Sequence, residues 1–309
     1  MSIPMLMTIL GVALLLIGIT IMPKGLEALG QTALRKAVSF FTSTPFYALL
    51  TGAVSTALVQ SSSVITVITI GLINSKLMNL PQGIGIILGA NIGTTITAQI
   101  IAFNLPSFNP WLLMPLAILC LIPLPKVRAL GQVGLGLSLI FLGLNIFENT
   151  FIPIKESSSL LGWFKILGDS YFLALLTGIV ITAIFQSSSA IIGLTIVLGE
   201  QGFIPLTNAI AIILGSNLGT CVTALIASST GNLDGKRLAL AHLLLNSFGI
   251  LIFFPFINLF ADFMSWGASD LSRQIANSHT FYNIACSLLI LPVIRHFTKL
   301  IYYFLPNSN

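Results

Sequence analysis

The sequence predicts an all-α polytopic membrane protein, and its composition is the first reason. Of the 309 residues, 56% are hydrophobic and only 7% are charged, whereas soluble domains carry about a quarter charged residues. Apolar runs long enough to cross a hydrocarbon core recur along the chain. A polar pattern inside these runs occurs twice. This composition excludes a nucleic-acid-binding protein and a secreted disulfide scaffold, so the net charge of +5 reflects membrane topology.

Seven apolar runs are predicted to cross the membrane. The first has no basic residue before it and no small-residue cleavage site after it, so we interpret it as a retained helix. The more polar stretch Lys24–Phe41 is predicted to lie along the membrane interface as an amphipathic helix. The predicted crossings are Met5–Met22, Pro81–Phe103, Trp111–Leu124, Leu130–Phe147, Ile204–Ala227, Leu238–Phe260 and Phe281–Ile294.

Two further apolar stretches, residues 46–73 and 172–199, are split by polar residues at their midpoints. Each arm of these stretches has about 13 residues and spans about 20 Å as a helix. That length is less than the roughly 30 Å needed to cross a bilayer core. The two stretches are therefore predicted to be re-entrant helical hairpins.

The distribution of basic residues predicts the orientation of the chain. With seven crossings and two hairpins, ten of the thirteen basic residues fall on one side of the membrane. The positive-inside rule makes that side cytoplasmic. The N-terminus is then predicted to lie outside and the C-terminus in the cytoplasm.

The sequence matches itself without a gap when it is shifted by 126 residues. ALLTGAVSTALVQSSSVI, from Ala48, aligns with ALLTGIVITAIFQSSSAI, from Ala174, and IILGANIGTTITA, from Ile86, aligns with IILGSNLGTCVTA, from Ile212. Three predicted crossings separate the copies, so the copies have opposite orientations. This pattern predicts an inverted-topology repeat with discontinuous helices, an architecture of secondary transporters. Residues 1–128 are predicted to form the first repeat, and residues 129–309 the second repeat with the C-terminal helices.

Four consecutive polar residues, QSSS, stand at the midpoint of each split stretch, at residues 60–63 and 186–189. A helix break at these points would free backbone N–H groups at the start of the second arm. Non-helical backbone at this depth is tolerated only where it is buried in protein or lines a water-filled cavity. The two tips are therefore the first candidates for a binding site.

A second pair of motifs combines two glycines with an asparagine, as GANIGT at residues 89–94 and GSNLGT at residues 215–220. This composition suits an unwound turn. Residues 81–103 and 204–227 are therefore predicted to be broken helices. Thr97 and Thr223 follow these motifs within about one helical turn.

None of the four motifs contains Lys, Arg, Asp or Glu. Hydroxyl and amide donors, together with the positive ends of half-helices, could hold an anion. Side-chain and backbone oxygens could equally hold a hard monovalent cation. A neutral site suits an anion and cations bound together, because each compensates the charge of the other at low dielectric constant.

The polar residues of the apolar segments also allow other interpretations. Isolated Ser and Thr residues commonly join membrane helices by hydrogen bonds, but that role leaves the duplicated QSSS tips unexplained. His242 with Asn246, and His279 with Asn283, repeat a four-residue spacing that suits a proton relay or a bond between helices. Cys120, Cys221 and Cys286 are interpreted as small core residues. The sequence has no helix-core carboxylate, no GxSxG elbow and no P-loop, so an enzyme is not expected.

The paired QSSS motifs, each followed by GxNxGT, resemble the type II sodium-dependent phosphate cotransporter family in its bacterial form. GKRLALAHLLLNSFGILIFFPF, from Gly235, and IANSHTFYNIACSLLILP, from Ile275, also resemble later helices of that family. The resemblance implies inward symport of inorganic phosphate with co-transported Na⁺, without an organic cofactor, across the inner membrane of a prokaryotic cell. Many bacterial members carry a C-terminal domain that resembles the regulatory protein PhoU, and we expect it to be absent here.

The same resemblance implies the residues of the site. The two QSSS tips would bind phosphate near the bilayer midplane, and Na⁺ would bind beside it. Cys221 stands where the first copy has Thr95, so the two halves cannot coordinate identically there. The implied phosphate residues are Ser61, Ser62, Ser63, Ser188, Ser189, Asn91 and Asn217, and the implied Na⁺ residues are Gln60, Asn91, Gln186, Ser187, Thr220 and Thr223.

Two other functions stay open at this point. One is Na⁺ symport of another oxyanion, such as sulfate or arsenate. The other is a phosphate or anion channel, or an exporter, that works without sodium.

Overall fold

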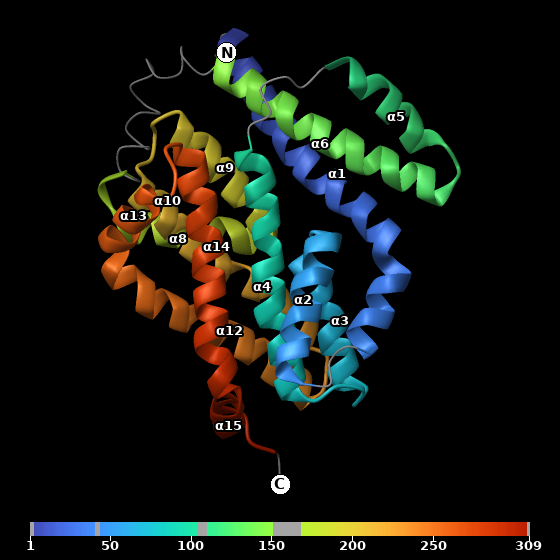
Figure 1. Cartoon of the computed structure of the whole chain (residues 1–309), viewed down its shortest axis with the longest axis vertical. Coiled ribbons are helices and arrows are strands. Elements are labelled where there is room, and N and C mark those ends of the chain that lie inside the picture. Colours follow the sequence, from blue (N-terminus) through green and yellow to red (C-terminus); the bar gives the residue numbers. More distant parts are fainter. Residues whose placement is uncertain (1–2, 41–43, 104–109, 151–167, 308–309) are drawn as a thin grey trace.

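The computed structural model describes residues 3–40, 44–103, 110–150 and 168–307. These residues form α-helices and short 3₁₀-helices without a strand, which confirms the predicted all-α class. α4 (Leu80–Ala102) and α14 (Leu271–Ile290) run side by side through the molecule, and the chain termini lie at opposite ends of its long axis (Figure 1). The segments long and apolar enough to cross a membrane are Leu6–Leu29, Leu80–Ala102, Pro125–Ile146, Leu206–Ser228, Leu233–Trp266 and Leu271–Phe304.

α1 (Ile3–Phe40) is one uninterrupted helix. The prediction of a separate interfacial helix at Lys24–Phe41 is therefore wrong. Packing accompanies this continuity, because α1 lies along α6 (Pro125–Thr150) at least as far as Gly25, past the start of the predicted interfacial stretch. A Cβ added to Gly25 would lie 2.5 Å from the carbonyl oxygen of Ala129. Glycine at such points lets two membrane helices approach at backbone distance.

The predicted crossing at Trp111–Leu124 is also wrong. Of the three crossings predicted between the two copies, Leu80–Ala102 and Pro125–Ile146 remain among the described residues, and the opposite orientation of the copies stays a prediction. The Trp111–Leu124 stretch contains a 3₁₀ turn (Pro110–Leu112) and the short helix α5 (Leu113–Leu121), which packs against α6. Nine helical residues span only about 14 Å, too little for a bilayer core. The helix ends where Ile122 becomes extended, with ψ 130°, because the following Pro123 disfavours a helical conformation for the residue before it.

Each split stretch forms two short helices, as predicted. The first stretch gives α2 (Pro45–Val59) and α3 (Ser62–Asn74), and the second gives α8 (Tyr171–Phe185) and α9 (Ser188–Glu200). The corresponding arms have the same lengths, 15 and 13 residues. In Figure 1, α2 and α3 lie toward the C-terminal end of the molecule, and α9 lies toward the N-terminal end.

Close packing of α2 on α4 is repeated by α8 on α10 (Leu206–Gly219). A Cβ added to Gly52 of α2 would collide with the carbonyl oxygen of Ile86, and one added to Gly178 of α8 would collide with that of Ile212. Both residues of the second pair lie 126 positions after those of the first. The internal sequence repeat is therefore also a repeat of helix packing.

The predicted break at residues 81–103 is wrong, because α4 is continuous through the GANIGT motif. The glycines of this motif allow α2 to pack closely on α4, and they do not interrupt the helix. Gly89 faces the backbone of Leu49, and Gly93 faces that of Ala53. The second copy is interrupted only at Thr220, between α10 and α11 (Cys221–Ser228).

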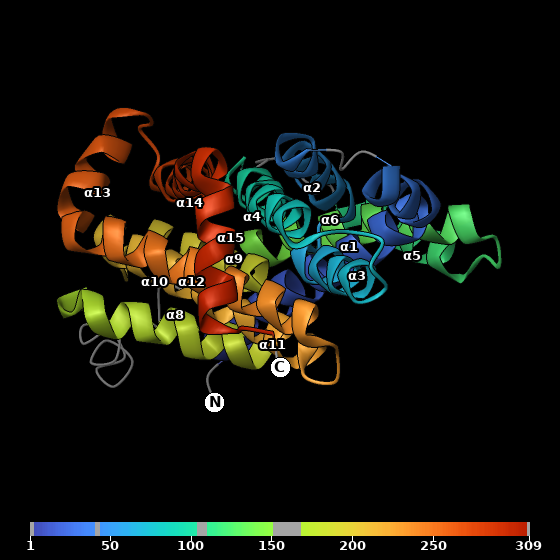
Figure 2. The same ribbon diagram turned by 90° about the horizontal axis from the view of Figure 1, so that it is seen from below.

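The last part of the chain contains a further repeat, with a shift of 37 residues. α12 (Leu233–Phe253) passes through a 3₁₀ turn at Pro255 into α13 (Ile257–Trp266), and α14 passes through one at Pro292 into α15 (Ile294–Phe304). The shift also places His242 on His279 and Asn246 on Asn283. α15 lies crosswise to α14, which is seen end-on in Figure 2. The predicted run Leu238–Phe260 thus contains a proline turn, and the run Phe281–Ile294 ends at one.

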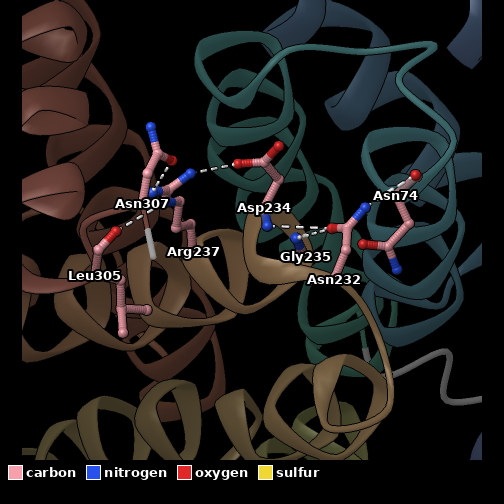
Figure 3. Close-up of polar contacts among 7 residues, drawn as sticks. All are labelled: Asn74, Asn232, Asp234, Gly235, Arg237, Leu305 and Asn307. Atoms are coloured by element: carbon pink, nitrogen blue, oxygen red, sulfur yellow. Dashed lines mark hydrogen bonds and ion pairs between the residues drawn. The ribbon is translucent and has the colours of Figure 1, made fainter. Parts of the chain in front are cut away.

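Hydrogen bonds connect the C-terminal segment to the start of α12 (Figure 3). The buried guanidinium of Arg237 donates to the backbone oxygen of Leu305 at 2.8 Å, to the Asn307 side chain at 2.8 Å and to Asp234 at 2.7 Å. Asn232, the N-cap of α12, donates to the backbone oxygen of Asn74 at 3.0 Å. These bonds join the C-terminal segment, the start of α12 and the end of α3.

Candidate functional site

The two QSSS tips have the same backbone geometry. Gln60 ends α2 in the left-handed region, with φ 56° and ψ 29°, and Gln186 ends α8 with φ 53° and ψ 30°. The first serine of each motif then caps the next helix. The Ser61 hydroxyl oxygen accepts from the N–H of Val64 at 3.4 Å, and that of Ser187 accepts from the N–H of Ala190 at 3.3 Å. Each QSSS motif is thus a left-handed helix end followed at once by an N-cap.

The next serines present hydrogen-bonding groups that the protein leaves available. Ser62 and Ser188 are buried, with 8% and 6% of their surfaces exposed. Within the described part of the chain, no hydrogen-bond partner is present for the hydroxyls of Ser62, Ser188 and Ser189. The first N–H groups of α3 and α9 also have no carbonyl to bond within their own helices. Each tip therefore combines serine hydroxyls with the positive end of a helix dipole.

The first tip contacts α4 through its glutamine. Gln60 is buried, and its side-chain carbonyl accepts a short hydrogen bond from the hydroxyl of Thr97. The amide group of Gln60 donates to the backbone oxygen of Ala57 at 2.5 Å. Gln186, at the same position in the second tip, is exposed. The two glutamines therefore have different environments although their backbones match.

The first tip also reaches the second repeat. The hydroxyls of Ser63 and Thr223 lie 3.5 Å apart, and Thr223 donates to the backbone oxygen of Thr220 at 2.5 Å. The structure thus brings the predicted residues Ser63, Thr220 and Thr223 together at the interruption between α10 and α11. It brings Gln186 to none of them through a hydrogen bond between described residues.

The two asparagines of the GxNxGT motifs have different partners. Asn91 donates to the side chain of Asn246, on α12, at 3.5 Å. Asn217 is buried and donates to the backbone oxygen of Ile213, in its own helix, at 3.1 Å. The side chain of Asn91 thus bonds to a neighbouring helix, whereas the side-chain amide of Asn217 bonds to the backbone of its own helix.

Sequence analysis missed two neighbours of this region, Asn246 and Cys221. Asn246 is buried and donates to the sulfur of Cys221 at 3.2 Å. Cys221 also approaches the backbone oxygen of His242 at 3.5 Å. The repeated His-x-x-x-Asn spacing is the available signal for Asn246, and for Cys221 it is the departure from Thr95 at the equivalent position of the first copy.

The second arms of the hairpins pack across the boundary between the repeats. α3 contacts α11 and α12, and α9 contacts α4 and α14. In the second case, a Cβ added to Gly193 of α9 would meet the Ile101 side chain of α4 at 3.0 Å. Each second arm thereby contacts a helix of the other predicted repeat, since α3 packs on α11 and α12 and α9 packs on α4.

His242 and His279 are buried, and neither ring nitrogen of either residue has a partner among the described groups. The described residues contain no group of three or more His, Cys, Asp and Glu able to hold a metal ion. The polar groups gathered at the tips are therefore neutral hydroxyls and amides. Such a set suits an oxyanion and a hard cation more than a transition metal.

The comparison with protein families agrees with this description. The model of the family described as Na⁺/Pi-cotransporter matches residues 14–149 and 156–267, and each stretch contains one QSSS motif. No solved structure matches the chain.

Curated relatives extend this result. The chain is 32% identical over 291 residues to YqeW of Bacillus subtilis, a protein named as uncharacterized, and covers 95% of it. It is 32% identical over 285 residues to YjbB of Escherichia coli, whose name assigns it provisionally to inorganic phosphate export, and spans about half (52%) of that protein. Over 64 residues, 21% of this chain and 9% of the relative, it is 45% identical to human sodium-dependent phosphate transport protein 2B.

The family match covers most of the chain, including both tips and the two GxNxGT motifs. It connects the all-α membrane architecture with phosphate transport and not with enzymatic activity. The chain belongs to the Na⁺/Pi-cotransporter family.

Proposed function

We propose that the protein imports inorganic phosphate by sodium-coupled symport, with phosphate and Na⁺ bound between the two QSSS tips near the bilayer midplane. The observation that carries this proposal is the matched geometry of the tips. Each presents a helix N-terminus and serine hydroxyls, and the motifs carry no charged side chain. Opposite orientation of the two repeats would let the site face each side of the membrane in turn.

Phosphate is bound by donors in this proposal. Ser61 and Ser187 use an oxygen lone pair for capping, so their hydroxyl protons remain able to donate. Ser62, Ser188 and Ser189 have their hydroxyls free of described partners. Hydrogen bonds to a charged acceptor are stronger than neutral ones. The proposed phosphate ligands are Ser61, Ser62, Ser63, Ser188, Ser189, Asn91 and Asn217.

Sodium is bound by neutral oxygens in this proposal. One set of sodium ligands comes from the second repeat and consists of Gln186, Ser187, Thr220 and Thr223. The equivalent ligands of the first repeat are Gln60 and Asn91. Two Na⁺ ions would compensate a divalent phosphate, which removes the cost of burying the dianion alone. The proximity of Ser63 to Thr223, at 3.5 Å, supports a shared site for anion and cation.

The energetics require more than one Na⁺ for each divalent phosphate. Moving HPO₄²⁻ inward against about 100 mV costs about 4.6 kcal/mol. One Na⁺ returns about 2.3 kcal/mol from the potential and about 1.4 kcal/mol from a tenfold gradient. Two ions together supply about 7.4 kcal/mol, which exceeds the cost. At least two Na⁺ per divalent phosphate are therefore proposed.

A second candidate function is phosphate export, or a channel that works without sodium. The name of YjbB, a relative at 32% identity over 285 residues, favours it. A Na⁺ symporter of another oxyanion is the alternative within the same class. Sulfate tests this alternative, because unlike protonated phosphate it has no hydrogen to donate.

The test is uptake of ³²P-phosphate into proteoliposomes containing the full chain. Inward Na⁺ and K⁺ gradients of equal size are compared, with empty liposomes as the control. Sodium-coupled import predicts accumulation only with Na⁺. Equal uptake of phosphate with K⁺ would contradict sodium coupling and favour a channel or exporter. Saturable uptake of labelled sulfate, with no uptake of phosphate, would indicate another substrate.

A further inference from the structure

Two neighbouring hollows lie between α12 and α15 and share part of their lining. Their volumes are about 610 and 560 Å³, and Leu244 and Phe304 line both. Each volume lies within the range of pockets that hold small molecules, about 300 to 1,000 Å³. We refer to the two hollows together as the α12–α15 groove.

The walls of the groove are mostly apolar, and polar residues line both hollows: Lys236, Ser228 and Ser229 the first, and Ser247 and His296 the second. Leu240, Leu251 and Leu300 are among the apolar lining residues. Leu251 is 70% exposed, so this apolar surface needs a covering of hydrocarbon. Lys236 and the adjacent residues Ser228 and Ser229 line the end formed by α11 and the start of α12.

The C-terminal anchor fixes one wall of the groove. Phe304 and Leu305 line it, and Arg237 holds the backbone of Leu305 at 2.8 Å (Figure 3). Tyr302 adds a cation–π contact, with its ring centroid 4.4 Å from the guanidinium of Arg237. Because Arg237 is buried and makes three hydrogen bonds, this wall is part of the packed structure.

Lys236 provides an uncompensated positive charge at the end formed by α11 and the start of α12. Its side chain is exposed, and it has no ion-pair partner within the described residues. The neighbouring carboxylate, Asp234, is already bonded to Arg237 at 2.7 Å. The hydroxyls of Ser228 and Ser229 donate to backbone oxygens of their own helix, at 3.1 and 2.7 Å. Their oxygens therefore remain as acceptors beside the lysine.

We propose that the α12–α15 groove binds one anionic phospholipid, with its phosphate at Lys236 and an acyl chain along α12. Lys236 lies one helical turn before Leu240, where the apolar wall begins. From Leu240 to Ile252, α12 rises about 18 Å along its axis, close to the roughly 15 Å of one hydrocarbon leaflet. A headgroup bearing hydroxyls, such as phosphatidylglycerol, would donate to the hydroxyl oxygen of Ser229, which is exposed. This site is independent of the transported substrate.

Native mass spectrometry of the full chain tests the proposal. The purified protein, in a neutral detergent, is titrated with phosphatidylglycerol or phosphatidylcholine carrying identical acyl chains. A lysine beside an anionic headgroup contributes about 1 kcal/mol, so we expect about fivefold tighter binding of phosphatidylglycerol. Lys236→Gln should abolish this preference. Lys126→Gln, which removes an exposed lysine at the start of α6, should preserve it.

Two further arms identify the ligand and the location. Millimolar inorganic phosphate should not displace the lipid, because the acyl chain supplies most of the contact area. Leu244→Trp, which fills the junction of the two hollows, should reduce binding of phosphatidylglycerol while the thermal unfolding midpoint stays unchanged. Equal binding of both lipids to the wild type, a preference that survives in Lys236→Gln, or displacement by inorganic phosphate would each overturn the proposal.

Discussion

The hydroxyl of Thr97 donates to the side-chain carbonyl of Gln60, whereas the equivalent residues Thr223 and Gln186 make no such bond. Gln60 is 6% exposed and Gln186 is an exposed residue. The backbone at the two glutamines is the same. The two halves of the chain thus share one packing scheme but differ in how the glutamine of each tip is held.

This asymmetry predicts different effects for two equivalent substitutions. Thr97→Val removes a donor from the buried Gln60, so the free energy of unfolding in detergent should fall by about 1–3 kcal/mol. Thr223→Val removes only a bond within the turn at Thr220 and a long contact to Ser63, so its effect should be smaller. Denaturant unfolding without phosphate measures both. Equal losses would show that the Gln60–Thr97 bond does not distinguish the halves.

Ser188→Ala should separate binding from stability. The hydroxyl of Ser188 has no described partner, so its removal should change the free energy of unfolding by less than about 0.5 kcal/mol. Loss of one hydrogen bond to a charged ligand, worth about 1.5–3 kcal/mol, should weaken phosphate binding by at least about tenfold. Equilibrium binding of ³²P-phosphate and thermal unfolding are the two measurements.

Thr195→Ala is the matched control for Ser188→Ala on the same helix. Its hydroxyl already donates to the backbone oxygen of Ile191 at 2.7 Å, so phosphate affinity should stay within about twofold of the wild type. Similar loss of affinity in both variants would contradict a specific role for the tip.

Gly89→Ala should be strongly destabilising. A Cβ at this position would overlap the carbonyl oxygen of Leu49, so α2 and α4 would have to separate. We expect a loss of several kcal/mol, in the upper range for single substitutions. Gly71→Ala in α3 is the control, because a Cβ there meets no atom within 4 Å. That change should stabilise the helix by up to about 1 kcal/mol, and equal effects of the two would disprove the packing role of Gly89.

Coupled transport should consume at least two Na⁺ ions per divalent phosphate. The prediction follows from the cost of moving the dianion against the membrane potential. Initial uptake of ²²Na⁺ and ³²P-phosphate in the same proteoliposomes gives the ratio, at a pH where the dianion dominates. A ratio of one would exclude this stoichiometry for HPO₄²⁻.

Sequence analysis predicted the hairpin tips because their signal is local. Four polar residues inside an apolar stretch demand a helix break, and Ser is a preferred N-cap residue. The internal repeat then indicated which elements should pack alike. The repeated contacts of Gly52 with Ile86 and Gly178 with Ile212 confirm that equivalence.

Two wrong predictions of the sequence analysis, the break in α4 and the crossing at Trp111–Leu124, each have a local physical reason. Gly89 and Gly93 were interpreted as flexible points, but their four-residue spacing places them on one helix face, where they allow close packing. The apolar composition of Trp111–Leu124 indicates a crossing, but Pro123 ends the helix before it is long enough to cross. The different environments of Gln60 and Gln186 could not be predicted, because their surrounding motifs are nearly identical in sequence.

The most direct test of a neutral site shared by phosphate and sodium is phosphate binding to the purified protein at varied Na⁺ concentration. K⁺ replaces Na⁺ to keep the ionic strength constant, and Ser188→Ala is measured in parallel. The proposal predicts that Na⁺ tightens phosphate binding and that phosphate tightens Na⁺ binding by the same factor. Phosphate affinity that is identical in Na⁺ and K⁺ would contradict it.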